Sequence, residues 1–338
     1  MPGCVVVRLS QNINLDPRLR GLPVGNATEF SRIPLLAGCT EIKAGDKARS
    51  KVTRGIPLEV RDVNSEWLWV SWVAAGWIKK ENVTTPDKAI EAFTAQIRQN
   101  PQDSGAYYAR GNTWHEKGEF DIAIKDFSDA ITLNPKGATA YYMARSNCWR
   151  RKKNVDKTLD DLTEAIRLDP KNASAYNARA DAWVKKTEFD KAIMDASEAV
   201  RLSPEFEYAY AIRAAAWAGK RDFEKALSDC NEAIRINPKS GEGYQLMAEL
   251  LAICPNAAHR NGQKAVEYAT KACERTNWKV ADCLDTLAAA YAETGDFTKA
   301  VEWQTKAISG AVQKDTAEFQ ERLDIYKSGK PYRDEPRK

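Results

Sequence analysis

The segment "WHEKGEFDIAIKDF" (Trp114–Phe127) begins with a His–Glu pair that could belong to a zinc site. In helical zinc sites of metalloproteases, two His residues four apart hold the metal and a Glu between them acts as base. Here the residue four after His115 is Glu119, so the second imidazole is missing. The other His in the chain is His259, and the seven Cys show no CxxC spacing. The sequence therefore predicts no metal site.

Other catalytic arrangements lack candidates as well. The chain contains no phosphate-binding loop and no dinucleotide-binding Gly motif, and its two His residues are isolated. We therefore predict a protein that is not an enzyme, without catalytic residues or cofactors. Cys254, Cys273 and Cys283 could approach one another, but small buried thiols are expected at these positions.

The opening segment is one copy of an internal repeat. Its Trp recurs at Trp149, Trp183 and Trp217, at intervals of 35, 34 and 34 residues. Tyr and Pro residues keep the same period: Tyr107, Tyr142, Tyr176, Tyr210 and Tyr244, and Pro101, Pro135, Pro170, Pro204 and Pro238. Each period contains two apolar-periodic runs of about a dozen residues, separated by a short turn and ended by Pro. One helix pair cannot bury both of its faces, so the copies must stack.

The frame of each copy resembles the tetratricopeptide repeat (TPR) family. The positions that carry the resemblance are Tyr107, Gly111, Trp114, Ala123, Phe127, Ala130 and Pro135. The resemblance implies a mainly all-α fold, a TPR α-solenoid of helix–turn–helix repeats. The expected parts are a half repeat at 86–103, repeats near 104–137, 138–172, 173–206, 207–240, 241–275 and 280–310, a capping helix at 311–328 and a tail at 329–338.

An Arg and an Asp recur 16 residues apart in four copies. The pairs are Arg110 and Asp126, Arg145 and Asp161, Arg179 and Asp195, and Arg213 and Asp229. Buried charge is tolerated mainly when it is paired, so we predict a structural ladder of ion pairs. The Asp could pair within its own copy or with the Arg of the next. The alternative is an anion site formed by the arginines.

The region before the repeats is predicted to form β-strands. Residues 47–83 contain short alternating runs such as "PLEVRDV" and "EWLWVSWV", with breaks expected at Gly55, Asn64 and Gly76. Leu58–Val63, Trp67–Val73 and the closing Gly-Trp-Ile resemble bacterial SH3-like domains. We expect a small all-β SH3-like barrel at 41–85 and an irregular segment at 1–40. The Trp residues of the expected barrel either fill its core or bind a peptide or cell-wall glycan.

The resemblance places a partner-binding groove on the first helices of the repeats. Its expected residues are Tyr108, Asn112, Met143, Asn147, Asn177, Asp181 and Lys185. The carboxylate clamp of chaperone adaptors is rejected, because only one of its five positions matches. A neutral or mildly basic partner segment is therefore favoured. The run "RRKK" (Arg150–Lys153) is attributed to the end of a helix, where cations complement the dipole.

These features predict a protein–protein interaction scaffold that captures partner segments in the groove, with the SH3-like domain as a second contact. The alternative is an envelope-associated protein that binds peptidoglycan or a surface protein through that domain. The net charge of +4 gives no case for a nucleic-acid partner, and no apolar run is long enough to span a membrane. The chain as written is expected in the cytoplasm. A missing leader would place it in the periplasm or envelope.

Overall fold

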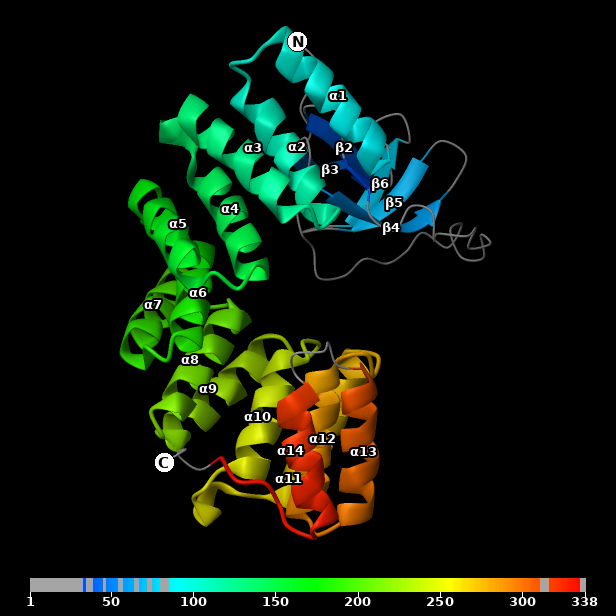
Figure 1. The fold of residues 1–338 in the computed structure, drawn as a ribbon, viewed down its shortest axis with the longest axis vertical. Helices are drawn as coiled ribbons and strands as arrows, with labels where there is room; N and C mark the ends of the chain where they lie inside the picture. Colours follow the sequence, from blue (N-terminus) through cyan, green and yellow to red (C-terminus); the bar gives the residue numbers. More distant parts are fainter. Residues whose placement is uncertain are drawn as a thin grey trace. The chain divides into compact units, whose positions relative to one another are not determined.

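The computed structural model describes residues 33–34, 39–44, 47–53, 57–63, 67–71, 75–79, 85–310 and 316–334. The chain divides into two compact units, unit 1 at Met1–Asp169 and unit 2 at Pro170–Lys338. Unit 1 contains the strands and helices α1 to α5, and unit 2 contains helices α6 to α14 (Figure 1).

The described strands of unit 1 pair antiparallel in the order β1-β4-β5-β6-β2-β3. They are β1 (Ile33–Pro34), β2 (Cys39–Ala44), β3 (Lys47–Thr53), β4 (Pro57–Val63), β5 (Trp67–Ser71) and β6 (Ala75–Lys79). Gly76 lies inside β6 and pairs with Val70, so it is not the predicted break between strands. β1 and the start of β2 fall within residues 1–40, for which we expected no regular element. This strand order does not by itself establish an SH3-like barrel.

The helices follow one another as pairs after a single first helix. Unit 1 has α1 (Pro86–Gln99), α2 (Ser104–Glu116), α3 (Phe120–Leu133), η4 (Pro135–Gly137), α4 (Thr139–Arg151) and α5 (Val155–Leu168). Unit 2 has α6 (Ala173–Lys185), α7 (Phe189–Leu202), α8 (Glu207–Gly219), α9 (Phe223–Ile236), α10 (Glu242–Ile253), η5 (Ala257–His259), α11 (Gly262–Arg275), α12 (Ala281–Glu293), α13 (Phe297–Gly310) and α14 (Thr316–Lys327). This arrangement confirms the predicted helix–turn–helix repeats.

Small residues let the two helices of a pair approach closely. A Cβ atom added to Gly111 of α2 would lie 2.7 Å from Cε1 of Phe127, whose side chain is only 1% exposed in α3. In the next pair Ser146 stands at the position of Gly111, and Leu162 stands at the position of Phe127. The residue on the first helix is thus larger than in the previous pair, and the residue on the second helix is smaller. In the third pair both positions hold Ala, at Ala180 and Ala196, so the frame keeps a small residue on the first helix while the size of its partner varies.

The turn inside most pairs uses one left-handed residue. Gly118, Lys153, Thr187, Arg221 and Gly295 have φ between 59° and 83°. Each residue follows the first helix of its pair and ends that helix. Only two of the five are Gly, so the other three pay a conformational cost that Gly avoids.

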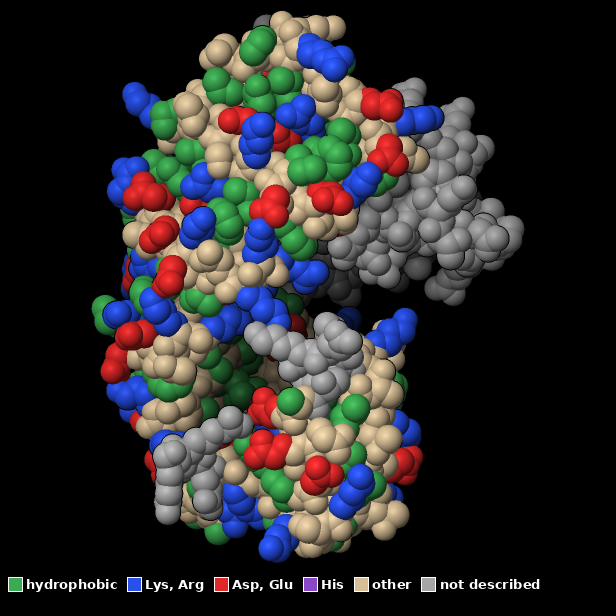
Figure 2. Space-filling model, in the orientation of Figure 1, with side chains coloured by type: hydrophobic (Ala, Val, Ile, Leu, Met, Phe, Trp, Pro, Cys, Tyr) green, Lys and Arg blue, Asp and Glu red, His purple; other side chains and the backbone are tan. Residues whose placement is uncertain are grey.

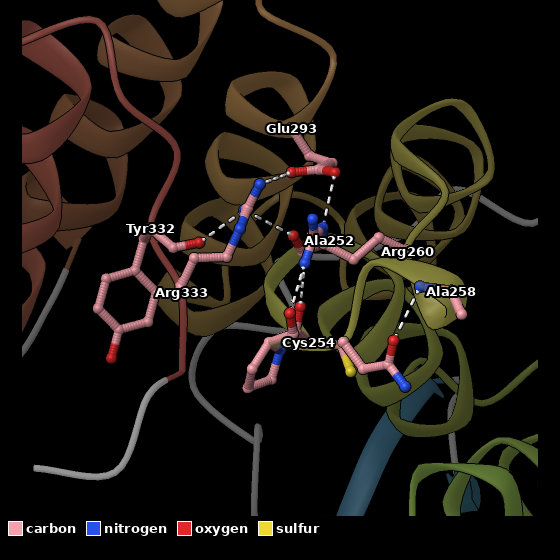
Figure 3. A network of polar contacts seen from close by, with 9 residues as sticks. Ala252, Cys254, Ala258, Arg260, Glu293, Tyr332 and Arg333 are labelled. Carbon is pink, nitrogen blue, oxygen red and sulfur yellow. Dashed lines mark hydrogen bonds and ion pairs between the residues drawn. The ribbon is translucent and has the colours of Figure 1, made fainter.

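The last described part of unit 2 is helix α14, followed by residues 328–334, which form neither helix nor strand. Phe319, Leu323 and Tyr326 of α14 are 6%, 6% and 0% exposed, which matches the apolar stripe expected of the capping helix. The fifth pair carries an insertion between α10 and α11, in which η5 lies. Residues 332–334, part of the predicted tail, contact α10 and α12 (Figure 3).

Candidate functional site

The Arg–Asp pairs form within single copies. In each pair the Arg Nε and Nη2 donate to the two carboxylate oxygens of the Asp, at 2.7–3.0 Å. The Asp side chains are 3–9% exposed and the Arg side chains 19–21% exposed. The geometry thus selects pairing within a copy over pairing with the next copy.

Three of these arginines also reach the preceding helix pair or half repeat. Nη1 donates to Thr94 Oγ1 from Arg110, to Ser128 Oγ from Arg145 and to Ser197 Oγ from Arg213. Each Arg of the ladder also lies over the ring of the Tyr three residues before it, at 5.4–5.8 Å. With its donors engaged in this way, the guanidinium joins two neighbouring copies.

Burial opposes the charge of the acidic partners. It raises the pKa of Asp126 and of Asp161, while the hydrogen bond and charge of the paired Arg act in the opposite direction. A bidentate Arg–carboxylate pair is the arrangement that best compensates such burial. The ladder therefore has the features of a packing element, and its arginines are engaged within the protein.

The first expected groove residue, Tyr108, is half-buried. Its ring lies 4.9 Å from that of Tyr141 and 5.8 Å from that of Phe127, measured between centroids. Burial raises the pKa of Tyr108, and a hydrogen bond with Asn112 partly offsets this effect. Tyr108 therefore contributes to the packing between α2, α3 and α4 as well as to the surface.

A hollow of about 460 Å³ opens in unit 1 where α2 and α4 end. Its lining residues are His115, Glu116, Gly118, Phe120, Asn147, Arg150 and Arg151, and we call it the Arg150–Arg151 hollow. Arg150 and Arg151 lie three and four residues after Asn147, which puts all three on one face of α4. The structure thus joins one expected groove residue, Asn147, to residues that we had assigned to other roles.

The hollow is polar and carries positive charge. The guanidinium of Arg151 lies over the Phe120 ring at 5.7 Å, and Arg150 Nη2 donates to Asn147 Oδ1 at a long 3.4 Å. Arg150 and Arg151 are exposed, so most of their donors face solvent. Within the described part of the chain, His115 Nε2 is buried and has no hydrogen-bond partner. Glu116 supplies the one acidic side chain of the lining.

Elsewhere on the surface the two signs of charge are mixed. Figure 2 shows Lys and Arg side chains interspersed with Asp and Glu over the helices that face the viewer. Several of these charges are paired along their own helix, as in Arg167–Glu164 and Lys271–Glu267. Such exposed pairs are typical of a solvated surface.

The expected groove residues of unit 2 differ from those of unit 1. Lys185 Nζ lies 2.5 Å from Asp181 Oδ2, so these two charges neutralise each other. Asn177 is partly buried, and within the described residues its Oδ1 has no hydrogen-bond partner. The expected groove positions of unit 2 therefore carry no net charge.

The cysteines of the helical part of the chain are buried free thiols: Cys148, Cys230, Cys254, Cys273 and Cys283. Cys254, Cys273 and Cys283 therefore do not form a disulfide with one another. Burial raises the pKa of the Cys283 thiol to about 11 and that of Cys273 to about 12. Among the described residues there is no cluster of three or more His, Cys, Asp or Glu that could bind a metal, and no helix long and apolar enough to cross a membrane.

Comparison with known proteins identifies tetratricopeptide repeats in parts of this chain. Models of the tetratricopeptide repeat match residues 85–138, 150–205 and 281–309. These matches and the stacked helix pairs establish TPR repeats in this chain. No curated protein gives a significant sequence match.

Two solved structures share this fold. A tetratricopeptide repeat protein from Parabacteroides merdae is 15% identical, with a TM-score of 0.55, over 72% of this chain and 92% of that one. The APC/C hetero-tetramer Cut9–Hcn1 is 12% identical, with a TM-score of 0.59, over 70% of this chain and 46% of that one. At this level of identity the likeness shows the fold alone.

Proposed function

We propose that this protein is an interaction scaffold that binds a segment of a partner protein through the first helices of its TPR repeats. The observation that carries the proposal is the Arg150–Arg151 hollow, which has the size of a ligand pocket and lies beside Asn147. Asn112 of α2 and Asn147 of α4 lie on the first helices of two successive repeats, and each offers both donors and acceptors to a peptide backbone.

The charge of the hollow specifies an acidic group in the partner. Two guanidinium groups against one carboxylate leave a net positive lining, which suits an Asp, a Glu or a C-terminal carboxylate. The sequence favoured a neutral or mildly basic segment, because of Asp181 and because the five positions of the chaperone clamp lack cations. The hollow uses other positions of the first helices, so its basic character is compatible with the absence of that clamp.

A capture experiment with the full-length chain tests this proposal. The baits are the natural chain, Arg150→Ala/Arg151→Ala, and a control with the same charge change, Lys125→Ala/Lys136→Ala, at exposed sites outside the hollow. Partners identified by mass spectrometry should be retained by the control and lost by the hollow variant. Partners retained equally by all three baits would refute the proposal.

A second step tests the chemistry of the captured segment. A synthetic peptide from the partner should lose binding by about tenfold or more when its acidic residue is replaced by the amide, since a charged hydrogen bond contributes ~1.5–3 kcal/mol. The intact peptide should bind Arg150→Ala/Arg151→Ala as weakly as the amide peptide does. Tyr108 is unsuited to this test because its ring packs against Phe127 and Tyr141.

We further propose residues 41–85 as an SH3-like module that makes a second contact. The support is the antiparallel run β4–β5–β6 and the alternation of Trp67 and Trp69 along β5. Binding of the full-length chain to purified peptidoglycan, lost in Trp67→Ala or Trp69→Ala, would favour the envelope-associated alternative. Free buried thiols are typical of a reducing compartment, so we propose a cytoplasmic location, which cell fractionation tests.

A further inference from the structure

The C-terminal segment of the described chain occupies a polar site on unit 2. Arg333 lies between the Glu293 carboxylate of α12 and the end of α10 (Figure 3), with Nη2 paired to Glu293 Oε2 and Nη1 donating to the Ala252 carbonyl at 3.3 Å. The Asp334 N–H donates to the Ile253 carbonyl at 3.1 Å. Arg221 holds the other side of Asp334, through its carbonyl and through Oδ2 at 3.0 Å. We call these partners (Ala252, Ile253, Glu293 and Arg221) the tail site.

The insertion in the fifth repeat creates this site. The last carbonyls of a helix lack partners within the helix, and the insertion after Ile253 replaces the usual turn. The Asn261 N–H donates to the Leu251 carbonyl at 2.9 Å. The Arg260 side chain donates to the Cys254 and Pro255 carbonyls at 2.8 and 2.9 Å. Between them, the carbonyls of Ala252 and Ile253 are bonded by Arg333 and by the Asp334 N–H. The α10 end thus receives an extended segment from elsewhere in the chain.

The chemistry of the site favours a cation preceded by an aromatic ring. The C-terminus of α10 carries a partial negative charge from the helix dipole. The carboxylate of Glu293, which is only 14% exposed, adds a full negative charge. Arg260 already pairs with Glu293 Oε1 at 3.0 Å, and Arg333 takes the second oxygen. Tyr332 lies under the Arg322 guanidinium at 4.5 Å and packs against the apolar core of unit 2. Three parts of the segment are therefore contacted by three different groups: the Asp334 N–H by the Ile253 carbonyl, the Tyr332 ring by Arg322, and the Arg333 guanidinium by Glu293.

We infer that the tail site is a peptide-binding site for an extended segment with an aromatic residue followed by Arg, and that the chain's own Tyr332–Asp334 fills it as a built-in competitor. The segment follows α14 directly, so its effective concentration at the site is on the order of millimolar. A partner segment of the same chemistry binds by displacing it. This surface belongs to unit 2 and is separate from the Arg150–Arg151 hollow.

The test uses a labelled peptide with the sequence of residues 328–334, SGKPYRD, amidated at its C-terminus. Its fluorescence anisotropy is followed during titration with the full-length natural chain, with Tyr332→Ala/Arg333→Ala, and with the control Lys330→Ala, whose side chain is exposed. The double variant should bind the peptide about tenfold or more tightly than the natural chain and the control, because its own segment no longer competes. A peptide with Ala in place of Arg should not bind.

Two further measurements make the outcome decisive. Adding Glu293→Gln to the double variant should weaken peptide binding at least tenfold, and thermal unfolding followed by circular dichroism shows whether each variant is folded. A folded double variant that fails to bind the peptide at millimolar concentration would overturn the inference. Equal binding by the natural chain and the double variant would also overturn it, since the segment would then not occupy the site.

Discussion

The ion pair between Arg145 and Asp161 should contribute far more to stability than an exposed pair on the same helix. Asp161 of α5 is 5% exposed and accepts two hydrogen bonds from Arg145, at 3.0 and 2.7 Å. Replacing Asp161 with Ala removes both bonds and leaves a guanidinium that is only 21% exposed without its carboxylate. Breaking a buried pair on one side costs ~3–5 kcal/mol, and the partial exposure of Arg145 places this case near 3 kcal/mol.

The matched control lies one turn away. Glu164 of α5 pairs with Arg167, and both side chains are well exposed, at 39% and 64%. Glu164→Ala should cost less than about 0.5 kcal/mol, because such a pair is screened by water. Both changes replace an acidic residue by Ala in the same helix. Asp→Ala gains slightly more helix propensity than Glu→Ala, which acts against the expected difference and makes the comparison conservative.

Urea denaturation followed by circular dichroism at 222 nm measures both variants. Asp161→Ala should lower the free energy of unfolding by ~3 kcal/mol, and Asp161→Asn, which keeps the shape but not the charge, by a smaller amount. The double variant Arg145→Ala/Asp161→Ala should be less destabilised than the sum of the two single changes, since the unpaired charge is removed. Equal losses in Asp161→Ala and Glu164→Ala would refute the structural role of the ladder.

Three more perturbations follow from the geometry. Thr187 has φ 59° at the turn after α6, so Thr187→Gly should raise the free energy of unfolding by about 0.5–1 kcal/mol. Thr305→Gly inside α13 should instead lower it by about 0.3–0.5 kcal/mol, and urea midpoints distinguish the two. Gly111→Ala places a Cβ 2.7 Å from the Phe127 ring and should cost about 1–3 kcal/mol, part of which Phe127→Leu should restore in the double variant, as thermal melts would show. Burial raises the pKa of Glu249 to about 7 from its ordinary 4.5, with the charge of Arg322 opposing the shift. Because the folded protein binds this proton more tightly than the unfolded chain, the neutral carboxyl is fully tolerated below pH about 4.5, and the folded state loses stability as the pH rises through 7. Gln stays neutral at every pH, so Glu249→Gln should raise the melting temperature at pH 8 and leave it nearly unchanged at pH 5. An equal change at both pH values would contradict the burial of that carboxyl.

The repeat spacing of the sequence already determined the helical architecture. Tyr, Gly or Ala, and Trp at helical spacing, followed by a Pro every 34 or 35 residues, define two helices per period that must stack to bury their faces. The Arg–Asp spacing of 16 residues also predicted a contact between the helices of the ladder. It left the choice of partner open, because a residue on the second helix faces both its own first helix and the next one.

The two proposed binding surfaces could be identified only from the tertiary structure. His115, Arg150 and Arg151 look like turn residues along the chain, and only the packing of α2 beside α4 brings them into one hollow. Helical spacing from Asn147 was the signal that could have identified the two arginines. The tail site joins residues more than 80 positions apart, so no local pattern predicts it: Arg333 bonds to Ala252 because an insertion leaves helix carbonyls unpaired. Local periodicity determines which helices form, but long-range contacts decide which polar groups remain for a partner.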